Sequence, residues 1–381
     1  MKIRVIASTK PGYQLDKADA LDFSGKSAGI CYMSSSIDEL FSEDSEKTEK
    51  RVKRTLESGH HSVYGHVTYN LVLEGIPKIL AMILNNEKIY NTSEKSARYT
   101  QMECSGKEKE LYDKWIEIFS MCISQEYPRF TKNIVKKYAQ ENARYLISIF
   151  NPSTTMEYTV SLQQLNYIIY WAQEYIKNTH DDKFTIKVKE VLKQFLEELP
   201  DIKVDGLDSS MKNRGFSLFS SRFVRYEEFG ENYSISYYAS FSQLGQALRH
   251  RTISYEMTFL DDNTFYIPPI IRNTDLEEQW LEDMASLSDL FPQGMQVLVN
   301  ERGTIENFAL KCTERLCGAA QLEIMQQTQE TLSLYLEYTK KLPELQHYLL
   351  QYSGGPRCTF KNFKCKSPCI FGCKEVMKRL I

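Results

Sequence analysis

The stretch that decides the fold is Gly59–Met102, which reads GHHSVYGHVTYNLVLEGIPKILAMILNNEKIYNTSEKSARYTQM. Thr68–Leu73 partly alternates apolar and polar side chains, which predicts a β-strand. Lys78–Leu84 carries apolar side chains at helical spacing, which predicts a short helix. Irregular polar sequence follows. The stretch therefore predicts a strand, a helix and a polar loop in that order.

Gly230–Met257, GENYSISYYASFSQLGQALRHRTISYEM, predicts the same order of elements. Its predicted strand is Ser234–Ala239 and its predicted helix is Phe241–Arg249. Between the two stretches, residues 199–215 are polar, contain Pro and Gly, and break the helical pattern. We therefore predict an α+β fold of two tandem domains, each a mixed sheet packed with long helices, followed by a Cys-rich tail. The predicted bounds are 1–200, 201–355 and 356–381.

The other predicted elements come from the same periodicities. The first is a strand at Lys2–Ala7. The predicted long helices are Glu49–Ser58, Glu108–Glu126, Asn133–Ser148, Ser161–Asn178, Ile186–Leu199, Leu276–Leu290, Asn307–Tyr338 and Pro343–Tyr352.

Composition limits the classes of function. The chain has 381 residues, 42% of them apolar and 25% charged, and a formal net charge of −3. These are ordinary globular values, and the charge does not favour a nucleic-acid or membrane-surface partner. The start, MKIRVIASTKPGY, predicts a first strand and not a signal peptide. No window approaches the roughly 20 apolar residues of a membrane span. We expect a cytoplasmic protein.

The triplet Arg249-His250-Arg251 is the strongest local concentration of donors. On a helix over Phe241–Arg251, Gln246, Arg249 and His250 would share one face. Guanidinium groups form forked hydrogen bonds with phosphates or ring carbonyls and stack on flat rings. The triplet thus suits a flat anionic ligand. The alternative is a solvated helix end whose cations complement the helix dipole.

Gly59–Met102 resembles the flavin-dependent thymidylate synthases. That family reads His-x-Ser/Thr-x-x-Glu-His, a strand, Gly-Ile, a helix, Arg-His-Arg-x-x-Ser and Glu/Gln-x-Ser-x-Arg-Tyr. The matching residues are His60, Ser62, His66, Gly75, Ile76, Glu94, Ser96, Arg98 and Tyr99. Gly65 replaces a Glu, and residues 86–88, Asn-Glu-Lys, replace Arg-His-Arg.

The second stretch resembles the same motif with the opposite losses. It keeps Glu231, Gln246, Arg249, His250, Arg251 and Ser254, whereas Phe259 and Asp261 replace the later Ser and Arg. Cys312–Ile324, CTERLCGAAQLEI, resembles the late helix of the family, with Arg315 at its arginine. In the first copy Ala172 lies near that position, and Arg144 resembles a second nucleotide-contacting arginine. The two copies together contain one complete motif.

The resemblance implies an enzyme that binds FAD and dUMP, with methylenetetrahydrofolate and NADPH as co-substrates. Arg315 would be catalytic, because it would stabilise negative charge on the uracil ring. The nucleotide-binding residues implied are Glu94, Ser96, Arg98, Tyr99, Arg144, Gln246, Arg249 and Arg315. The FAD-binding residues implied are His60, Ser62, Glu231, Arg249, His250 and Arg251.

The family resemblance also implies self-association, because its members are tetramers whose sites combine subunits. A duplicated chain would then form a dimer that acts as a pseudo-tetramer, with each site shared between the two degenerate repeats. Two alternatives remain. One is a non-catalytic scaffold that binds nucleotide or flavin, and the other is a related flavoenzyme acting on a different pyrimidine nucleotide.

The tail has cysteines in the spacing C-x6-C-x3-C-x3-C, at Cys358, Cys365, Cys369 and Cys373. Zinc sites usually contain C-x2-C or C-x4-C pairs, so this spacing fits a metal site imperfectly. A metal site, a redox-active thiol set and disordered thiols stay equally open. We assign no metal site and keep these cysteines as weak candidates.

Overall fold

The computed structural model of the chain describes residues 1–9, 16–30, 36–96, 100, 102–210, 214–220, 227–260 and 262–381. These residues form two compact units. Unit 1 comprises Met1–Lys95 and Phe150–Ser217, and unit 2 comprises Ser96–Ile149 and Leu218–Ile381. Residues 96–149 thus pack with the second half of the sequence, although they lie before the predicted boundary near residue 200.

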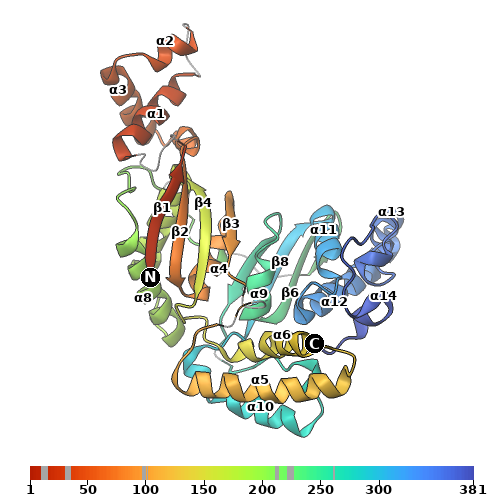
Figure 1. The fold of residues 1–381 in the computed structure, drawn as a ribbon. Coiled ribbons are helices and arrows are strands. Elements are labelled where there is room, and N and C mark those ends of the chain that lie inside the picture. The colour runs from red at the N-terminus through yellow and green to blue at the C-terminus, as the bar shows by residue number, and fades with distance from the viewer. Residues whose placement is uncertain are drawn as a thin grey trace. The chain divides into compact units, whose positions relative to one another are not determined.

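Unit 1 contains a four-stranded antiparallel sheet in the order β1-β2-β4-β3 (Figure 1). The strands are β1 (Lys2–Ser8), β2 (Thr68–Ile76), β3 (Tyr90–Glu94) and β4 (Thr154–Ser161). Along β2 the alternate residues Tyr69, Leu71 and Leu73 are buried, which confirms the predicted strand. The helices that follow its strands are α4 (Lys78–Asn86), α7 (Leu162–Asn178) and α8 (Lys183–Glu198).

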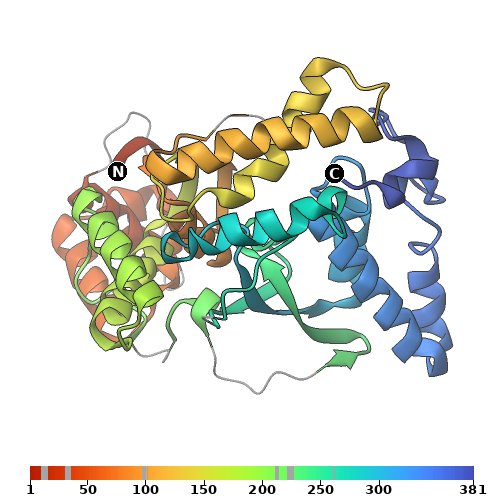
Figure 2. The ribbon, with the colours of Figure 1, turned by 90° about the horizontal axis from the view of Figure 1, so that it is seen from below.

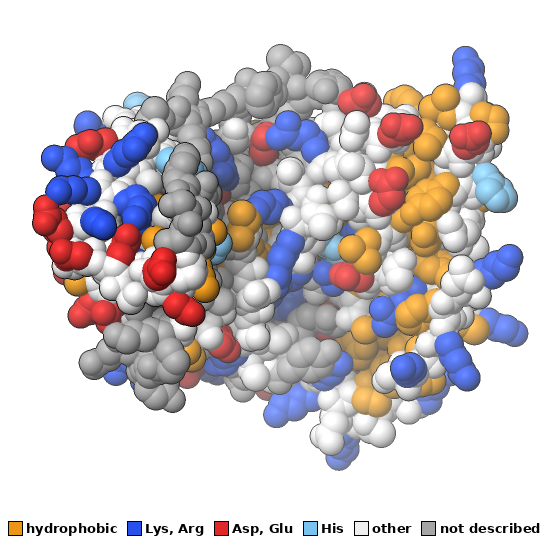
Figure 3. All heavy atoms as spheres, turned by 90° about the horizontal axis from the view of Figure 1, so that it is seen from above, with side chains coloured by type: hydrophobic (Ala, Val, Ile, Leu, Met, Phe, Trp, Pro, Cys, Tyr) orange, Lys and Arg blue, Asp and Glu red, His pale blue; other side chains and the backbone are white. Residues whose placement is uncertain are grey.

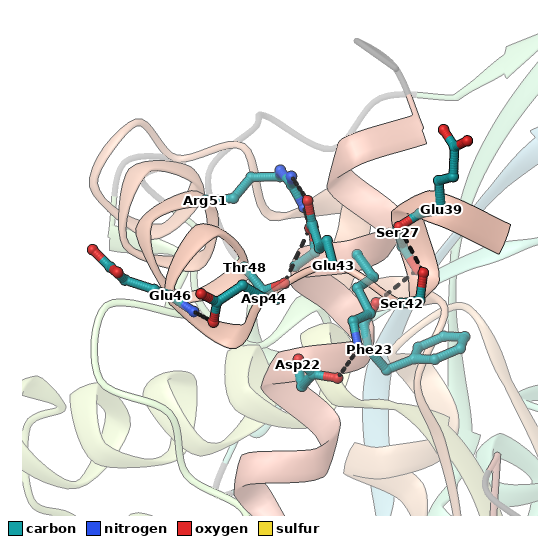
Figure 4. A network of polar contacts seen from close by, with 12 residues as sticks. Asp22, Phe23, Ser27, Glu39, Ser42, Glu43, Asp44, Glu46, Thr48 and Arg51 are labelled. Carbon is teal, nitrogen blue, oxygen red and sulfur yellow. Dashed lines mark hydrogen bonds and ion pairs between the residues drawn. The ribbon is translucent and has the colours of Figure 1, made fainter. Parts of the chain in front are cut away.

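Three short helices near the N-terminus pack as a separate layer of unit 1. They are α1 (Lys17–Gly29), α2 (Ile37–Phe41) and α3 (Ser45–Glu57). Gly25 allows α1 to approach α3, because a Cβ there would lie 2.6 Å from the Thr48 side chain. Arg51 donates to both Glu43 carboxylate oxygens at 2.6 and 3.0 Å and to the Gly25 carbonyl at 2.8 Å (Figure 4). The Arg51 guanidinium accordingly holds the pKa of Glu43 below its usual range.

Unit 2 repeats the topology of unit 1. Its sheet has the order β5-β6-β8-β7, again antiparallel. The strands are β5 (Glu228–Phe229), β6 (Asn232–Ser240), β7 (Ser254–Thr258) and β8 (Gln296–Thr304). Helix α9 (Phe241–Ala247) follows β6 as α4 follows β2, and α11 (Ile305–Arg315) follows β8 as α7 follows β4. A sheet packed with long helices in each unit confirms the α+β class, whereas the predicted mixed sheets are antiparallel throughout the described residues. The duplication stays a prediction.

A helical layer completes unit 2. It is built from α5 (Gly106–Glu126), α6 (Lys132–Ala143), the 3-10 turn η3 (Arg144–Leu146) and α10 (Asp275–Ala285). Figure 2 shows α5 running beside α10. Trp115 meets Trp280 edge-to-face with ring centroids 4.8 Å apart, and its Nε1 donates to Asp283 at 2.8 Å. These contacts bury the apolar face of α5 against the second half of the sequence.

Two predicted helices end earlier than the sequence pattern indicates. The helix expected over Asn307–Tyr338 is two helices, α11 and α12 (Leu322–Tyr338), separated by residues 316–321. The break contains Gly318, where a Cβ would lie 2.8 Å from the Cys369 Sγ atom. Helix α9 ends at Ala247, because the His250 N–H bonds to the Ala247 carbonyl at 2.9 Å in a tighter turn. The prediction that Gln246, Arg249 and His250 share a helical face was wrong.

The remaining predicted helices are confirmed, although those expected over Asn133–Ser148 and Leu276–Leu290 end earlier, at Ala143 and Ala285. Helix α6 gives way to η3 at Arg144, and α13 covers Pro343–Leu350. The strands β3, β4, β5, β7 and β8 and the helices α1 and α2 were not predicted. Within the described residues, no helix combines the length and apolar character that a membrane crossing requires.

Candidate functional site

Arg315, the last residue of α11, is held by a histidine in unit 2. Its Nε donates to the Nε2 atom of His250 at 2.6 Å, and its Nη2 contacts the Gln246 carbonyl at 3.4 Å. Because a guanidinium only donates, His250 accepts at Nε2 and carries its proton on Nδ1. That nitrogen lies 3.6 Å from a carboxylate oxygen of Glu314. The tautomer of His250 is therefore set by Arg315.

His250 is neutral in this arrangement. Burial is the main cause that lowers its pKa from 6.5 to about 2, and the positive charges of Arg315 and Lys311 contribute to the same shift. A neutral imidazole orients the guanidinium without cancelling its charge. His250 therefore adds no charge beside Arg315, whose Nη2 lies 3.8 Å from a carboxylate oxygen of the exposed Glu314.

A buried hydrogen-bond network runs from Arg315 to the segment before β4. The Gln321 N–H donates to Gln246 Oε1 at 3.1 Å, and the Gln321 side chain donates to the Tyr145 hydroxyl. Tyr145 in turn donates to Glu323 at 2.9 Å. Ser240, the N-cap of α9, donates to Glu323 through its N–H at 2.8 Å and its hydroxyl at 2.6 Å. Side chains from both halves of the sequence thus form one network in unit 2.

Glu323 ties this network to Arg144. Burial raises the pKa of Glu323, while hydrogen bonds from Ser240 and Tyr145 and the positive charge of Arg144 act against the rise. Arg144 itself is only 5% exposed, and its guanidinium lies 5.8 Å from the Tyr145 ring centre. Arg144 was predicted from the first copy and Arg315 from the second, and both lie in unit 2.

Several buried polar atoms in or beside this network lack a hydrogen-bond partner within the described part of the chain, and two of them belong to predicted or linking residues. These two are Nε of Arg144 and Oε1 of Gln321. Buried polar groups are normally paired, so an unpaired donor and acceptor close to one network indicate a place for a polar ligand. The site therefore offers a cationic donor, an amide acceptor and the Arg315 charge.

The C-terminus holds the loop that carries this site. Arg379 is 4% exposed and donates to the carbonyls of Cys317 at 3.3 Å and Ala320 at 2.6 Å. Its Nε donates to the Ile381 carbonyl at 2.8 Å. These bonds satisfy backbone carbonyls of residues 316–321, the break between α11 and α12. Sequence reasoning missed Arg379, because it lies outside every motif and acts on backbone atoms.

Further predicted residues also belong to unit 2. Arg249 is half-buried, and Arg251 and Glu231 are exposed. Ser96 begins unit 2, and its carbonyl accepts from the Thr100 N–H at 3.1 Å. Arg98 and Tyr99 lie outside the described residues.

Three predicted residues belong to unit 1. The Glu94 side chain is 2% exposed and pairs with Lys78 at 2.6 Å, while its second oxygen accepts from Asn85 at 3.3 Å. His60 and Ser62 are exposed at the 3-10 turn η2 (His61–Gly65).

The tail cysteines are free thiols. Among the described residues, no group of three or more His, Cys, Asp or Glu side chains could hold a metal ion. Cys369 packs on Gly318, as described above, which places it against the loop after Arg315.

Comparison with known proteins finds similarity to one family over part of the chain. Residues 16–171 match the family model described as "Thymidylate synthase complementing protein". This range includes Glu94, Ser96 and Arg144 and excludes Arg249 and Arg315. A flavin-dependent thymidylate synthase of Pyrococcus furiosus is 27% identical over 111 residues, which cover 26% of this chain and 44% of the relative. The match thus spans less than half of the relative's length.

Solved structures show only distant similarity. A flavin-dependent thymidylate synthase from Helicobacter pylori complexed with FAD and dUMP gives a TM-score of 0.33 at 17% identity, covering 52% of this chain and 94% of the other. A UMP/dUMP methylase from Streptomyces cacaoi bound with 5-Br dUMP gives 0.33 at 11% identity, covering 51% and 87%. These scores are too low to carry an argument about fold or site.

Proposed function

We propose that the chain is an FAD-dependent methyltransferase, which is supported by the match of residues 16–171 to the thymidylate synthase complementing protein family. It converts dUMP to dTMP, with methylenetetrahydrofolate as the one-carbon donor and NADPH as the reductant. The observation that carries this proposal is the Arg315–His250 pair and its buried link to Arg144 in unit 2.

The residues of this network fit a uridine nucleotide. The unpaired Nε of Arg144 can donate to an anionic oxygen, and the unpaired Oε1 of Gln321 can accept from a ring N–H. Arg315, oriented by neutral His250, stabilises negative charge that develops on the uracil ring. Burial around Tyr145 and Glu323 excludes water and strengthens these interactions.

The donor set also fits FAD. Arg249 and Arg251 would hold its anionic phosphates, with Glu231, His60 and Ser62 as the further predicted contacts. When bound, FAD supplies the hydride and one-carbon transfer chemistry. We assign His250 the role of positioning Arg315, because its Nε2 accepts from that residue and its Nδ1 faces Glu314.

The central experiment measures dTMP formation and FAD content of the purified chain. Arg315→Lys should lower turnover by about 10²–10³-fold, because it removes a planar donor from the developing charge. Arg302→Lys is the matched control, since Arg302 on β8 pairs with Glu256 on β7. A chain that binds neither FAD nor dUMP contradicts the proposal. A chain that binds both without turnover is the scaffold alternative, and methylation of UMP but not dUMP would indicate a different pyrimidine substrate.

We further propose that the site combines residues of both repeats. This is supported by the presence of Arg144 and Arg315 in one unit. Arg98→Ala and Arg249→Ala should each abolish turnover, and Arg144→Ala should weaken dUMP binding by about tenfold or more. Arg129→Ala, an exposed arginine between α5 and α6, should leave binding unchanged. Turnover that survives Arg98→Ala would refute the shared site.

Self-association to a dimer belongs to the same proposal. Hydrophobic side chains gather at the right of Figure 3, over the α12–α13 end of unit 2. The exposed ones on these elements are Leu334, Tyr338, Leu342 and Leu350. Such patches are typical of protein interfaces. Light scattering should give twice the chain mass, and a monomer at micromolar concentration would contradict a dimer.

A further inference from the structure

Unit 1 also contains a guanidinium bonded to a buried acceptor. The acceptor corresponds in position to His250 of the Arg315 site. Glu87 follows Pro77, the N-cap of α4, by the same ten residues by which His250 follows Ser240, the N-cap of α9. By the same comparison of helix N-caps, Ala172 in α7 corresponds to Arg315 in α11. Unit 1 therefore has a carboxylate in place of the imidazole and a methyl group in place of the guanidinium.

The missing guanidinium comes from the segment that follows α8. Arg214 pairs with Glu87, whose side chain is completely buried. The same guanidinium lies 4.3 Å from the ring centre of Trp171, the residue before Ala172. A planar guanidinium can stack on an indole ring and bond to a carboxylate at the same time, which an ammonium group cannot do.

Two neighbours of Arg214 complete the contact. The Ser217 N–H donates to Glu87 at 2.8 Å, and Asn86 donates to the Ser217 hydroxyl at 2.8 Å. Phe216 is 4% exposed and meets the Trp171 ring edge-to-face at 6.2 Å. Residues 214–217 thus cover the end of α4 with a cation, an aromatic ring and a hydroxyl.

We propose that Arg214 is an internal ligand of unit 1, and that Glu87, Trp171 and Ser217 form a binding slot for a flat cation of the guanidinium class. Because Arg214 occupies this slot, the position in unit 1 that corresponds to the Arg315 site is filled. It follows that the chain binds uridine nucleotide only at the unit 2 site. This consequence rests on the proposed function, whereas the binding slot itself is independent of that function.

The test is chemical rescue of the full-length chain, followed by thermal unfolding. Arg214→Ala leaves a buried carboxylate without its cation and should lower the Tm by about 5–10 °C. Adding about 10 mM methylguanidinium should restore at least half of that loss by binding the native state. Methylammonium at the same concentration should restore much less. Lys203→Ala, in the same segment and exposed, is the control and should show neither effect.

A second variant covers the case in which Arg214→Ala does not fold. Arg214→Ser is a second small variant that leaves the place of the guanidinium over Trp171 empty, and it should also gain Tm with methylguanidinium. Equal rescue by methylammonium, or a Tm unchanged in Arg214→Ala, overturns the proposal. Because the readout is stability without flavin or nucleotide, its failure is distinguishable from failure of the proposed enzyme activity.

Discussion

The two units share a strand order and differ in the acceptor that contacts a guanidinium. In unit 2, neutral His250 accepts from Arg315 and adds no charge to the contact, while a carboxylate oxygen of the exposed Glu314 lies 3.8 Å from the guanidinium. In unit 1, the buried Glu87 carboxylate pairs with Arg214, whose guanidinium lies over the Trp171 ring. Unit 2 thus has a neutral buried acceptor beside its guanidinium, where unit 1 has a buried carboxylate.

Burial acts on both acceptors in the same physical sense, because it favours the uncharged form of each. It lowers the pKa of His250 to about 2 and raises the pKa of Glu87. For Glu87 the charge of Arg214 and the hydrogen bonds from Ser217 oppose that rise. The carboxylate therefore depends on its cation, and the imidazole does not.

Exchanging the two acceptors, His250 and Glu87, tests the difference between the units most directly. His250→Glu should place a buried carboxylate against Arg315 and lower dTMP formation by about 10²-fold, because the ion pair cancels the charge the nucleotide needs. Glu87→His is the matched control and should keep turnover per folded molecule within about twofold. Turnover measurements, corrected for the folded fraction by circular dichroism, decide the outcome. Equal losses in both variants would refute the difference between the sites.

A second prediction concerns the link from Arg315 to Arg144. Tyr145→Phe removes a hydroxyl that serves both Gln321 and Glu323, so it should lower the free energy of unfolding by about 2–3 kcal/mol. It should also weaken dUMP binding. Tyr158→Phe in unit 1 loses the hydroxyl that bonds to the Leu84 carbonyl and should cost about 1 kcal/mol without changing dUMP binding. Urea unfolding and calorimetric titration with dUMP measure the two effects.

The third prediction concerns the C-terminal support of unit 2. Arg379→Ala removes the donors to the Cys317 and Ala320 carbonyls and should cost about 1–2 kcal/mol of stability. Because the loop also carries Gln321, dUMP affinity should fall in parallel. Lys378→Ala, exposed and adjacent, should change stability by less than about 0.5 kcal/mol. Unchanged dUMP affinity in Arg379→Ala would contradict a positioning role.

The smallest expected effect is a pH dependence of stability. The pKa of His250 is depressed in the folded chain, so the unfolded chain binds an extra proton as the pH falls below 6.5. The contribution of neutral His250 to the free energy of unfolding is therefore present above pH 6.5 and is lost as the pH falls. The wild-type advantage over His250→Gln should shrink by about 1 kcal/mol between pH 6.5 and 5.5. Parallel stability curves for the two proteins would show that His250 titrates normally.

Much of the fold was predictable from local sequence. The alternation in β2 and β6 and the helical periodicity of α5, α7 and α8 located these elements, because burial of one face repeats at a fixed spacing. Strands such as β8 were missed, since NERGT at its end interrupts the apolar pattern. The end of α9 and the break before α12 were also missed. They depend on a tight turn at His250 and on Cys369 packing against Gly318.

For the candidate site, the sequence by itself determined which side chains to propose for the chemistry, among them Arg144, Gln246, Arg249, His250 and Arg315. Only the tertiary structure decided how they combine. It pairs Arg315 with His250, brings Arg144 into unit 2 and places Arg214 against Glu87. The physical reason is that periodicity records which face of an element is buried, whereas a hydrogen-bond partner far along the chain is chosen by packing.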